Sequence, residues 1–194
     1  MSDARLEAQF DNFFALFEQP IQFDVSQSTL DQRLRLLQKR YHPDNIAKTG
    51  DDMATAMQRS EQASALINHA YQTLSHPDSR AAYLLDMADQ AQTLEHSIAD
   101  LDFLDDAMTM RIDLDEAIDG QDRPALEQLH PQVTERLHRQ SARFNQAYSE
   151  QDWPTAIDAT QKLKFLVKLD ADITSGLDDV ASAAQADDDD DLYV

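Results

Sequence analysis

The clearest hydrophobic pattern in the chain predicts an amphipathic helix that ends at a proline. Its apolar stripe consists of residues that recur every three to four positions: Leu30, Leu34, Leu37 and Tyr41. The faces turned away from this stripe carry four basic residues, Arg33, Arg35, Lys39 and Arg40. Pro43 lacks an amide hydrogen and disfavours helical dihedral angles at the residue before it. An exposed turn is therefore predicted at His42, Pro43 and Asp44, which we call the His42 corner.

Helical periodicity continues on both sides of this corner. Residues 10–18 are rich in aromatic side chains but too few for a stable isolated helix, so they are expected to pack against later elements. After a polar loop that includes Gly50, a long helix is predicted over 53–74, antiparallel to the basic helix. Its expected buried stripe comprises Met57, Ala63, Leu66, Ile67, Ala70, Tyr71 and Leu74. A short helix is predicted over 79–86.

The C-terminal half of the chain predicts three further helices, over residues 100–119, 123–149 and 154–182. Because the loops between them are short, neighbouring helices are expected to run antiparallel and to form a three-helix bundle. The fold class predicted from these patterns is all-α, with an N-terminal helical hairpin followed by the bundle. The predicted parts are residues 1–87, a linker at 88–99, the bundle at 100–183 and a disordered acidic tail at 184–194.

Three prolines in the bundle region constrain where its helices begin and end. Pro124 and Pro154 each follow an aspartate and fit the first turn of the second and third helices, where a missing amide hydrogen costs little. Pro131 lies well inside the second helix. A kink or break is therefore predicted near residues 129–130.

The helix predicted over 100–119 has two apolar stripes, although a bundle helix needs only one. The first stripe is expected to enter the core and comprises Phe103, Ala107, Met110, Leu114, Ala117 and Ile118. The second, which we call the apolar strip, comprises Leu101, Leu104, Met108 and Ile112. Acidic residues flank it, and methionine suits adaptable contacts, so the strip is predicted to bind a protein. The alternative is that the linker or the preceding short helix covers it.

Composition and charge argue against several kinds of binding site and partner. The 194 residues include no cysteine, which excludes disulfides and thiolate metal sites. The formal net charge of −21 argues against a nucleic acid or an anionic membrane as the main partner. The N-terminus lacks the pattern of a signal peptide, and no apolar run is long enough to cross a bilayer. A cytoplasmic location is the simplest expectation.

Catalysis is not expected. No two of the six histidines have the helical spacing, with a glutamate between them, that a zinc site would need, and no glycine-rich phosphate loop occurs. Pro43 directs the side chains of His42 and Asp44 without creating a pocket for acid–base chemistry. The chain is therefore predicted to have no catalytic residue, metal or cofactor. A structural helical adaptor in which the His42 corner is inert stays open as an alternative.

The basic helix, the corner and the helices around them resemble the J-domain, the module that stimulates ATP hydrolysis by DnaK-type chaperones. The resemblance covers residues 10–86 and includes the spacing of Arg80 and Tyr83. It implies chaperone binding through His42, Pro43, Asp44, Arg35, Lys39 and Arg40. Asp31 departs from the pattern, since many J-domains carry a basic residue there.

A second His-Pro-Asp sequence, at residues 76–78, lacks a preceding basic helix. Ser75 or His76 is expected to end or cap one helix there, while Pro77 and Asp78 suit the first turn of the next. This copy is therefore predicted to be structural.

The C-terminal half is similar to that of the HscB family, J-type co-chaperones of iron–sulfur cluster biogenesis. The similarity rests on Asp102-Phe103-Leu104, Met110-Arg111, Leu114-Asp115-Glu116 and the segment Lys162-Leu-Lys-Phe-Leu-Val-Lys-Leu169. It implies that the J-domain recruits the chaperone HscA while the bundle holds the scaffold protein IscU, so that clusters pass to acceptor proteins. The implied scaffold-binding residues are Leu104, Asp105, Met108, Thr109, Ile112, Glu116 and Phe165. A monomer is expected, and a different client protein is the alternative.

Some of these positions depart from the family pattern, and others fit two interpretations. Asp105 replaces an apolar residue of the family pattern, and Thr109 and Ile112 replace acids, so the contact is expected to be more apolar at Ile112 and less so at Asp105. Phe165 suits the bundle core and the scaffold contact about equally. The lysines at 162, 164 and 168 are expected either to contact the scaffold or to form a solvated face beside the acidic helix.

Overall fold

The computed structural model describes residues 10–47, 53–90 and 98–190, and every regular element in these ranges is a helix. The chain divides into two compact units, residues 1–89 and 90–194. This division falls inside the predicted linker, of which residues 91–97 lie outside the described part. Each unit is considered by itself below.

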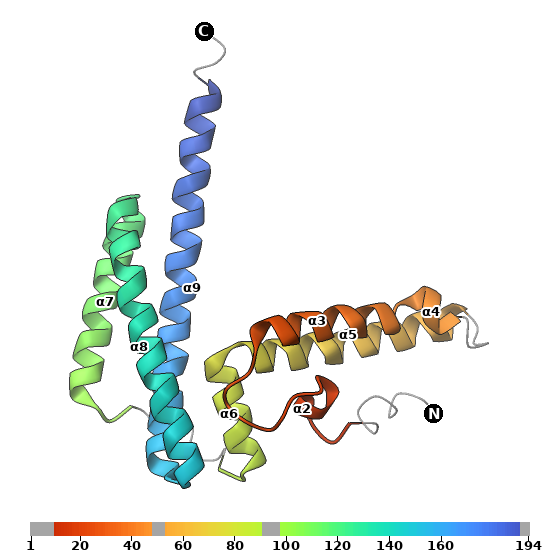
Figure 1. Cartoon of the computed structure of the whole chain (residues 1–194). Helices are drawn as coiled ribbons and strands as arrows, with labels where there is room; N and C mark the ends of the chain where they lie inside the picture. Colours follow the sequence, from red (N-terminus) through yellow and green to blue (C-terminus); the bar gives the residue numbers. More distant parts are fainter. Residues whose placement is uncertain (1–9, 48–52, 91–97, 191–194) are drawn as a thin grey trace. The chain divides into compact units, whose positions relative to one another are not determined.

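The first unit is built on a helical hairpin. Its helices are α2 (Phe13–Leu16), α3 (Gln27–Arg40), α4 (Pro43–Ala47), α5 (Met53–Ser75) and α6 (Pro77–Met87). Helix α3 lies along α5, as Figure 1 shows. The apolar stripe of α3 enters the core through Leu30 and Leu37, where it faces a buried row on α5 that includes Ile67 and Leu74. The hairpin therefore follows the predicted pattern.

The aromatic segment before α3 covers one side of this hairpin, as expected. Phe14, Leu16 and Phe17 are buried, and the Phe13 ring stacks on the Tyr83 ring of α6 with 4.7 Å between their centroids. The Phe13 amide also donates a hydrogen bond of 3.0 Å to the Tyr83 hydroxyl. Helix α2 is thus held by packing against a later element rather than by its own length.

Two predictions for this unit are wrong in detail. The chain after His42 does not remain a turn, because Pro43 starts the short helix α4, where its fixed φ angle and missing amide hydrogen suit the first position. The buried face of α5 is also shifted at its start. Met57 is exposed there, while Ala56 and Ser60 are buried beside α3 and α4. The buried face of α5 therefore begins at the small residues Ala56 and Ser60 and does not include Met57.

The second unit is a three-helix bundle with the predicted order of helices: α7 (Leu101–Asp119), α8 (Arg123–Glu150) and α9 (Trp153–Asp190). The helices lie side by side and alternate in direction (Figure 1). Its core contains Met110, Leu114, Ala117, Leu126, Leu129, Val133, Leu166, Leu169 and Ile173. As predicted, aspartates precede both prolines of the first turns, and the Asp122 carboxylate accepts a hydrogen bond of 3.1 Å from the Ala125 amide.

Pro131 does not break α8, which continues from Arg123 to Glu150 with this proline inside it. Residues on both sides of the proline, Leu129 and Val133, are buried in the core, so packing against α9 holds the helix together. The Gln132 side chain also donates a hydrogen bond of 3.2 Å to the Gln128 carbonyl, close to the point where the proline disrupts the backbone bonds. The predicted break is therefore wrong.

The predicted disordered tail is wrong over residues 184–190, where α9 remains helical up to Asp190. The segment Ala183-Ala184-Gln185-Ala186 consists of strong helix formers, which extend the helix before the aspartates begin. Residues 191–194 lie outside the described part.

Replacing Pro131 by alanine is expected to stabilise the bundle by about 2 kcal/mol. Alanine supplies the backbone amide hydrogen that proline lacks in the interior of α8, and the exposed position has room for the change. Urea unfolding followed by the fluorescence of Trp153, the single tryptophan, reports on this unit alone. The matched control is Pro124→Ala, which changes a first-turn proline and should leave the midpoint nearly unchanged. A Pro131→Ala midpoint equal to that of the control would show that α8 accommodates its proline without cost.

Candidate functional site

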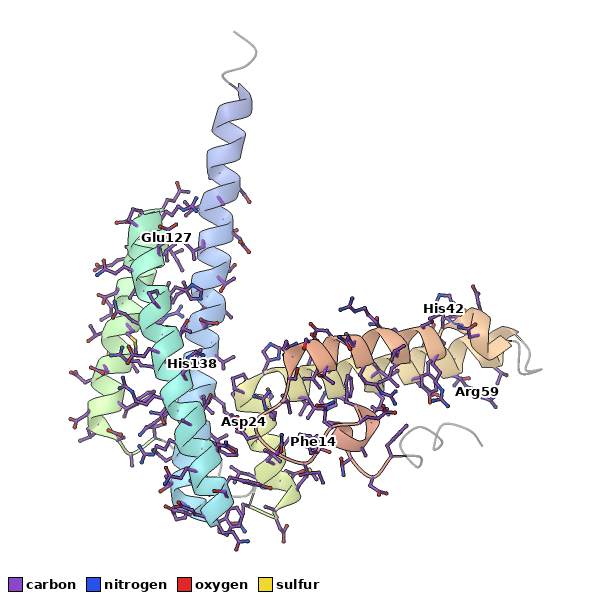
Figure 2. The ribbon with its side chains drawn as sticks, viewed as in Figure 1. Phe14, Asp24, His42, Arg59, Glu127 and His138 are labelled. Carbon is purple, nitrogen blue, oxygen red and sulfur yellow. The ribbon has the colours of Figure 1, made fainter. Side chains whose placement is uncertain are left out.

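The His42 corner lies on the surface at the end of α3. Figure 2 shows His42 beside the start of α4. The His42 and Asp44 side chains are 58% and 85% exposed, and the imidazole Nδ1 lies 3.7 Å from an Asp44 carboxylate oxygen. The same nitrogen accepts a hydrogen bond of 3.3 Å from the Asp44 amide. This bond orients the ring and leaves its other edge available to a partner.

Hydrogen bonds to the backbone hold this corner in place. The hydroxyl of the buried Ser60 on α5 donates a bond of 2.8 Å to the Tyr41 carbonyl, immediately before His42. The Asn45 side chain donates one of 2.6 Å to the Lys39 carbonyl at the end of α3. Because both bonds satisfy carbonyl groups at the end of the helix, they fix the exit of α3 and the direction of the chain that follows.

Two of the three basic residues predicted to act with the His42 corner line the same hollow in the surface. Arg35 and Lys39 line a shallow hollow together with Gln38, His42, Asp44 and Asn45. The Arg40 guanidinium lies outside this lining, over the Tyr41 ring at 5.8 Å from its centroid. Arg35, Lys39, His42 and Asp44 therefore form the compact part of the predicted chaperone-binding set.

Asp31, which departs from the J-domain pattern, connects the two helices of the hairpin. Its carboxylate accepts a hydrogen bond of 2.7 Å from the Tyr71 hydroxyl on α5 and another of 2.9 Å from the Gln27 side chain. The bond from Tyr71, followed by burial and by the carboxylate charge, raises the pKa of Tyr71. The missing basic residue is thus replaced by a structural contact.

The second His-Pro-Asp sequence has the geometry of a helix start. His76 is the residue before α6, Pro77 occupies its first turn, and the His76 Nδ1 atom lies 3.0 Å from the Gln72 carbonyl oxygen. Arg80, one turn later, is buried and donates a hydrogen bond to the Leu74 carbonyl. Burial lowers the pKa of Arg80 to about 10, although the charges of Asp24 and Asp78 oppose this effect. The segment serves the fold of the hairpin.

The apolar strip lies on the surface of the bundle. All four of its residues are exposed, with between 41% and 77% of their surface accessible. The core stripe of the same helix is turned inward, since Ala107, Met110, Leu114 and Ala117 are buried. The structure thus separates the two stripes of α7 as the sequence predicts. Asp105, Thr109 and Glu116, the polar residues of the predicted scaffold-binding set, are exposed on the same helix.

Phe165 lies on α9 and is half-buried against the bundle core. Its ring meets the Phe103 ring of α7 edge to face, with 6.0 Å between the centroids. Phe103 is the neighbour of Leu104, so Phe165 lies close to the start of α7 rather than among the central strip residues. One side of the ring packs on the core, as the core interpretation predicts, and the scaffold contact of Phe165 stays a prediction.

Ion pairs connect α7 to both α8 and α9. Arg111 pairs with Asp172 of α9, and Arg136 of α8 pairs with Asp106 at 3.0 Å. At the start of α7, the Lys162 ammonium lies 2.6 Å from the Asp100 carboxylate. These pairs flank the core stripe and fix the rotation of the helix about its axis.

Lys162 does not lie on a solvated face, which was one of the two expectations for it. It is 2% exposed and therefore does not belong to a solvated face, whereas Lys164 and Lys168 are exposed. A signal was present in the spacing, because Lys162 lies three residues after Ala159 and four before Leu166, both of which are buried. Its charge obscured this periodicity.

The described residues contain no group of three or more histidine, cysteine or acidic side chains that could hold a metal ion. Within the same ranges, none of the helices has the length and apolar character needed to cross a membrane.

Residues 99–174 match a family described as the HSCB C-terminal oligomerisation domain. A co-chaperone protein HscB homolog of Acinetobacter baumannii is 36% identical over 167 residues, which cover 86% of this chain and 91% of that protein. The chain belongs to the HscB family of co-chaperones. The HscB homolog of Photobacterium profundum is 37% identical over 161 residues, covering 81% and 92% of the two chains.

Solved structures of the HscB family confirm the fold class. The chaperone HscB from Vibrio cholerae matches with a TM-score of 0.68 and 33% identity, over 87% of this chain and 99% of that one. Human co-chaperone HscB matches with a TM-score of 0.66 and 25% identity, over 84% and 82%. The chain thus has the all-α fold of an N-terminal J-domain hairpin and a C-terminal three-helix bundle.

Replacing Tyr71 by phenylalanine is expected to destabilise the J-domain hairpin by about 1 kcal/mol, because the hydrogen bond to Asp31 is lost. The folded pKa of Tyr71 lies above the unfolded value of about 10. Its contribution is therefore complete below that pH and is lost as the pH rises through the folded pKa. Hydrogen exchange of α3 and α5 amides near neutral pH should show the loss of stability in the variant, with the amides of α8 as the internal control. Urea unfolding of the parent, repeated across the pH range of tyrosine ionisation, should show the pH effect. Equal protection of α3 in the variant and the parent would contradict this role.

Proposed function

We propose that this HscB family member stimulates the ATPase of the DnaK-type chaperone HscA and delivers the iron–sulfur scaffold IscU to it. In this proposal the J-domain contacts the chaperone while the bundle holds the scaffold. Delivery promotes transfer of the cluster and maturation of iron–sulfur proteins. The observation that carries the proposal is the presence of two exposed surfaces of different chemistry, the His42 corner and the apolar strip, in separate compact units.

The chaperone contact is assigned to His42, Pro43 and Asp44 with the basic residues Arg35, Lys39 and Arg40. Opposite charges on the chaperone would steer the encounter with the basic helix, and the exposed imidazole and carboxylate would then form directional hydrogen bonds. The corner can act without large rearrangement, since hydrogen bonds from Ser60 and Asn45 already fix the backbone on either side.

The scaffold contact is assigned to Leu104, Asp105, Met108, Thr109, Ile112, Glu116 and Phe165. Burial of the exposed strip supplies the main driving force, at about 25 cal/mol for each Å² of apolar surface removed from water. Asp105 and Glu116 suit a scaffold segment with basic side chains beside an apolar patch. Binding both partners at once raises the concentration of the scaffold near the chaperone, so the proposed mechanism is tethering without chemistry in this chain.

A second copy of this chain is the competing occupant of the strip, because the matched family is described as an oligomerisation domain. Our expectation is a monomer. Sedimentation of the chain without scaffold separates the two: a dimer that Met108→Glu dissociates would assign the strip to self-association.

The His42→Gln variant is expected to lose stimulation of the HscA ATPase and to return it to the basal rate. The imidazole is exposed, so the helical content measured by circular dichroism should be unchanged. The matched control is His76→Gln, which alters the other His-Pro-Asp sequence and should retain stimulation. Full stimulation by His42→Gln, or an equal loss in His76→Gln, would reject the assignment of the corner.

The Met108→Glu variant is expected to weaken IscU binding by at least about 1 kcal/mol, the usual threshold for an interface anchor. Isothermal titration calorimetry measures the change directly. Met57→Glu is the matched control, because Met57 is also exposed but lies in the J-domain. If the double variant Leu104→Ala, Met108→Glu binds IscU as tightly as the parent, the client of this chain is a different protein.

A further inference from the structure

One lysine side chain lies in the interior of the bundle, where a charged group is costly to bury. Lys162 is 2% exposed, and its ammonium lies 2.6 Å from the Asp100 carboxylate and 2.9 Å from that of Asp158. The ammonium also lies over the face of the Phe103 ring, with its nitrogen 5.4 Å from the ring centroid. Two carboxylates and an aromatic face thus surround a group with three donors, which offsets the cost of removing its charge from water.

Asp100 has two roles at the start of α7. It is the N-cap residue, and its Oδ1 atom accepts a hydrogen bond of 3.0 Å from the Phe103 amide. Its other carboxylate oxygen accepts the bond from Lys162. The bond from Lys162, together with the cap, lowers the pKa of Asp100. One carboxylate therefore both begins α7 and ties its first turn to α9.

This first turn carries part of the proposed scaffold contact. Leu101 and Leu104 of the apolar strip lie on it, and both are exposed. Phe103, between them, contacts Lys162 and also meets the Phe165 ring of α9. The relative placement of the two strip leucines and Phe165 thus depends on the angle at which α7 begins, which the Lys162 contact sets.

Stability alone gives a weak reason for this arrangement. Apolar side chains of similar volume in place of a buried ion pair are often neutral or stabilising, because charges are costly to desolvate. An ion pair differs from apolar packing in specifying a length and a direction. The cluster also includes a residue of α8, since the Arg143 guanidinium lies 3.6 Å from the Asp158 carboxylate. Two cations and two carboxylates therefore join the start of α7 to α8 and α9.

We propose that Lys162 is the positioning residue of the scaffold-binding surface. By holding Asp100 it orients the first turn of α7, so that Leu101, Leu104 and Phe165 present one continuous contact to the scaffold protein. Lys162 itself is buried and does not touch the partner. This inference rests on the proposed function of the strip and adds the interior contact that shapes it.

Two substitutions remove this contact in different ways. Lys162→Met keeps an unbranched stem in the same space and removes the ammonium, while Asp100→Asn keeps a good N-cap residue and removes the carboxylate charge. Purified IscU is titrated with each variant by calorimetry, well below the temperature at which the bundle unfolds. Each single variant is expected to weaken affinity about tenfold, and the double variant no further, because both changes remove one contact.

Asp158→Asn is the matched control. It removes a carboxylate from the same ammonium but leaves the bond between Lys162 and Asp100, so its affinity for IscU should remain close to that of the parent. Hydrogen exchange of the Phe103 and Leu104 amides supplies a second measurement that needs no partner. Exchange should accelerate there in Lys162→Met and Asp100→Asn, while the Leu114 amide near the middle of the core stripe keeps its protection.

The outcomes separate this inference from the function on which it rests. If the parent binds IscU and Met108→Glu does not, but Lys162→Met and Asp100→Asn bind like the parent with only a lower melting temperature, then Lys162 is purely structural and the inference is overturned. If the parent itself does not bind IscU, the proposed function fails first, and the positioning role falls with it.

Discussion

A helix with two apolar faces can bury only one of them between two neighbours, and this constraint shapes the second unit. The core stripe of α7 packs on α8 and α9, which leaves the apolar strip in water. A rotation of roughly 130° about the helix axis would exchange the two faces. The ion pairs of Asp106 with Arg136 and of Arg111 with Asp172 oppose that rotation from opposite sides. Exposure of the strip is thus built into the bundle.

The J-domain holds the His42 corner in place by a different means. The His42 and Asp44 side chains are mostly exposed, so hydrophobic packing contributes little to their placement. Directional hydrogen bonds do this instead. Ser60 holds the backbone just before the corner, and the contact between Asp31 and Tyr71 joins α3 to α5 at the far end of the hairpin. The small, charged surface is therefore rigid because the helices behind it are joined at both ends.

Hydrophobic periodicity was enough to predict the helices, the hairpin, the bundle and the two stripes of α7, because each depends on spacing within one segment. Several errors arose where another segment decides the outcome. Packing of α8 on α9 overrides the helix-breaking effect of Pro131. The face of α5 that is buried at its start contains Ala56 and Ser60 and leaves Met57 exposed. Lys162 is buried because Asp100, sixty-two residues away in sequence, supplies its counter-charge. The local spacing indicates that position 162 faces the core, but it does not identify the residue that supplies the counter-charge.

The division into two units, each with its own buried core, has a consequence for damaged copies of the protein. Loss of one surface need not unfold the unit that carries the other. Under the proposed function, a copy with a defective His42 corner would still occupy the scaffold but could not pass it on. Such a copy would compete with intact ones in the same cell and act as an inhibitor, which is a more harmful outcome than simple absence.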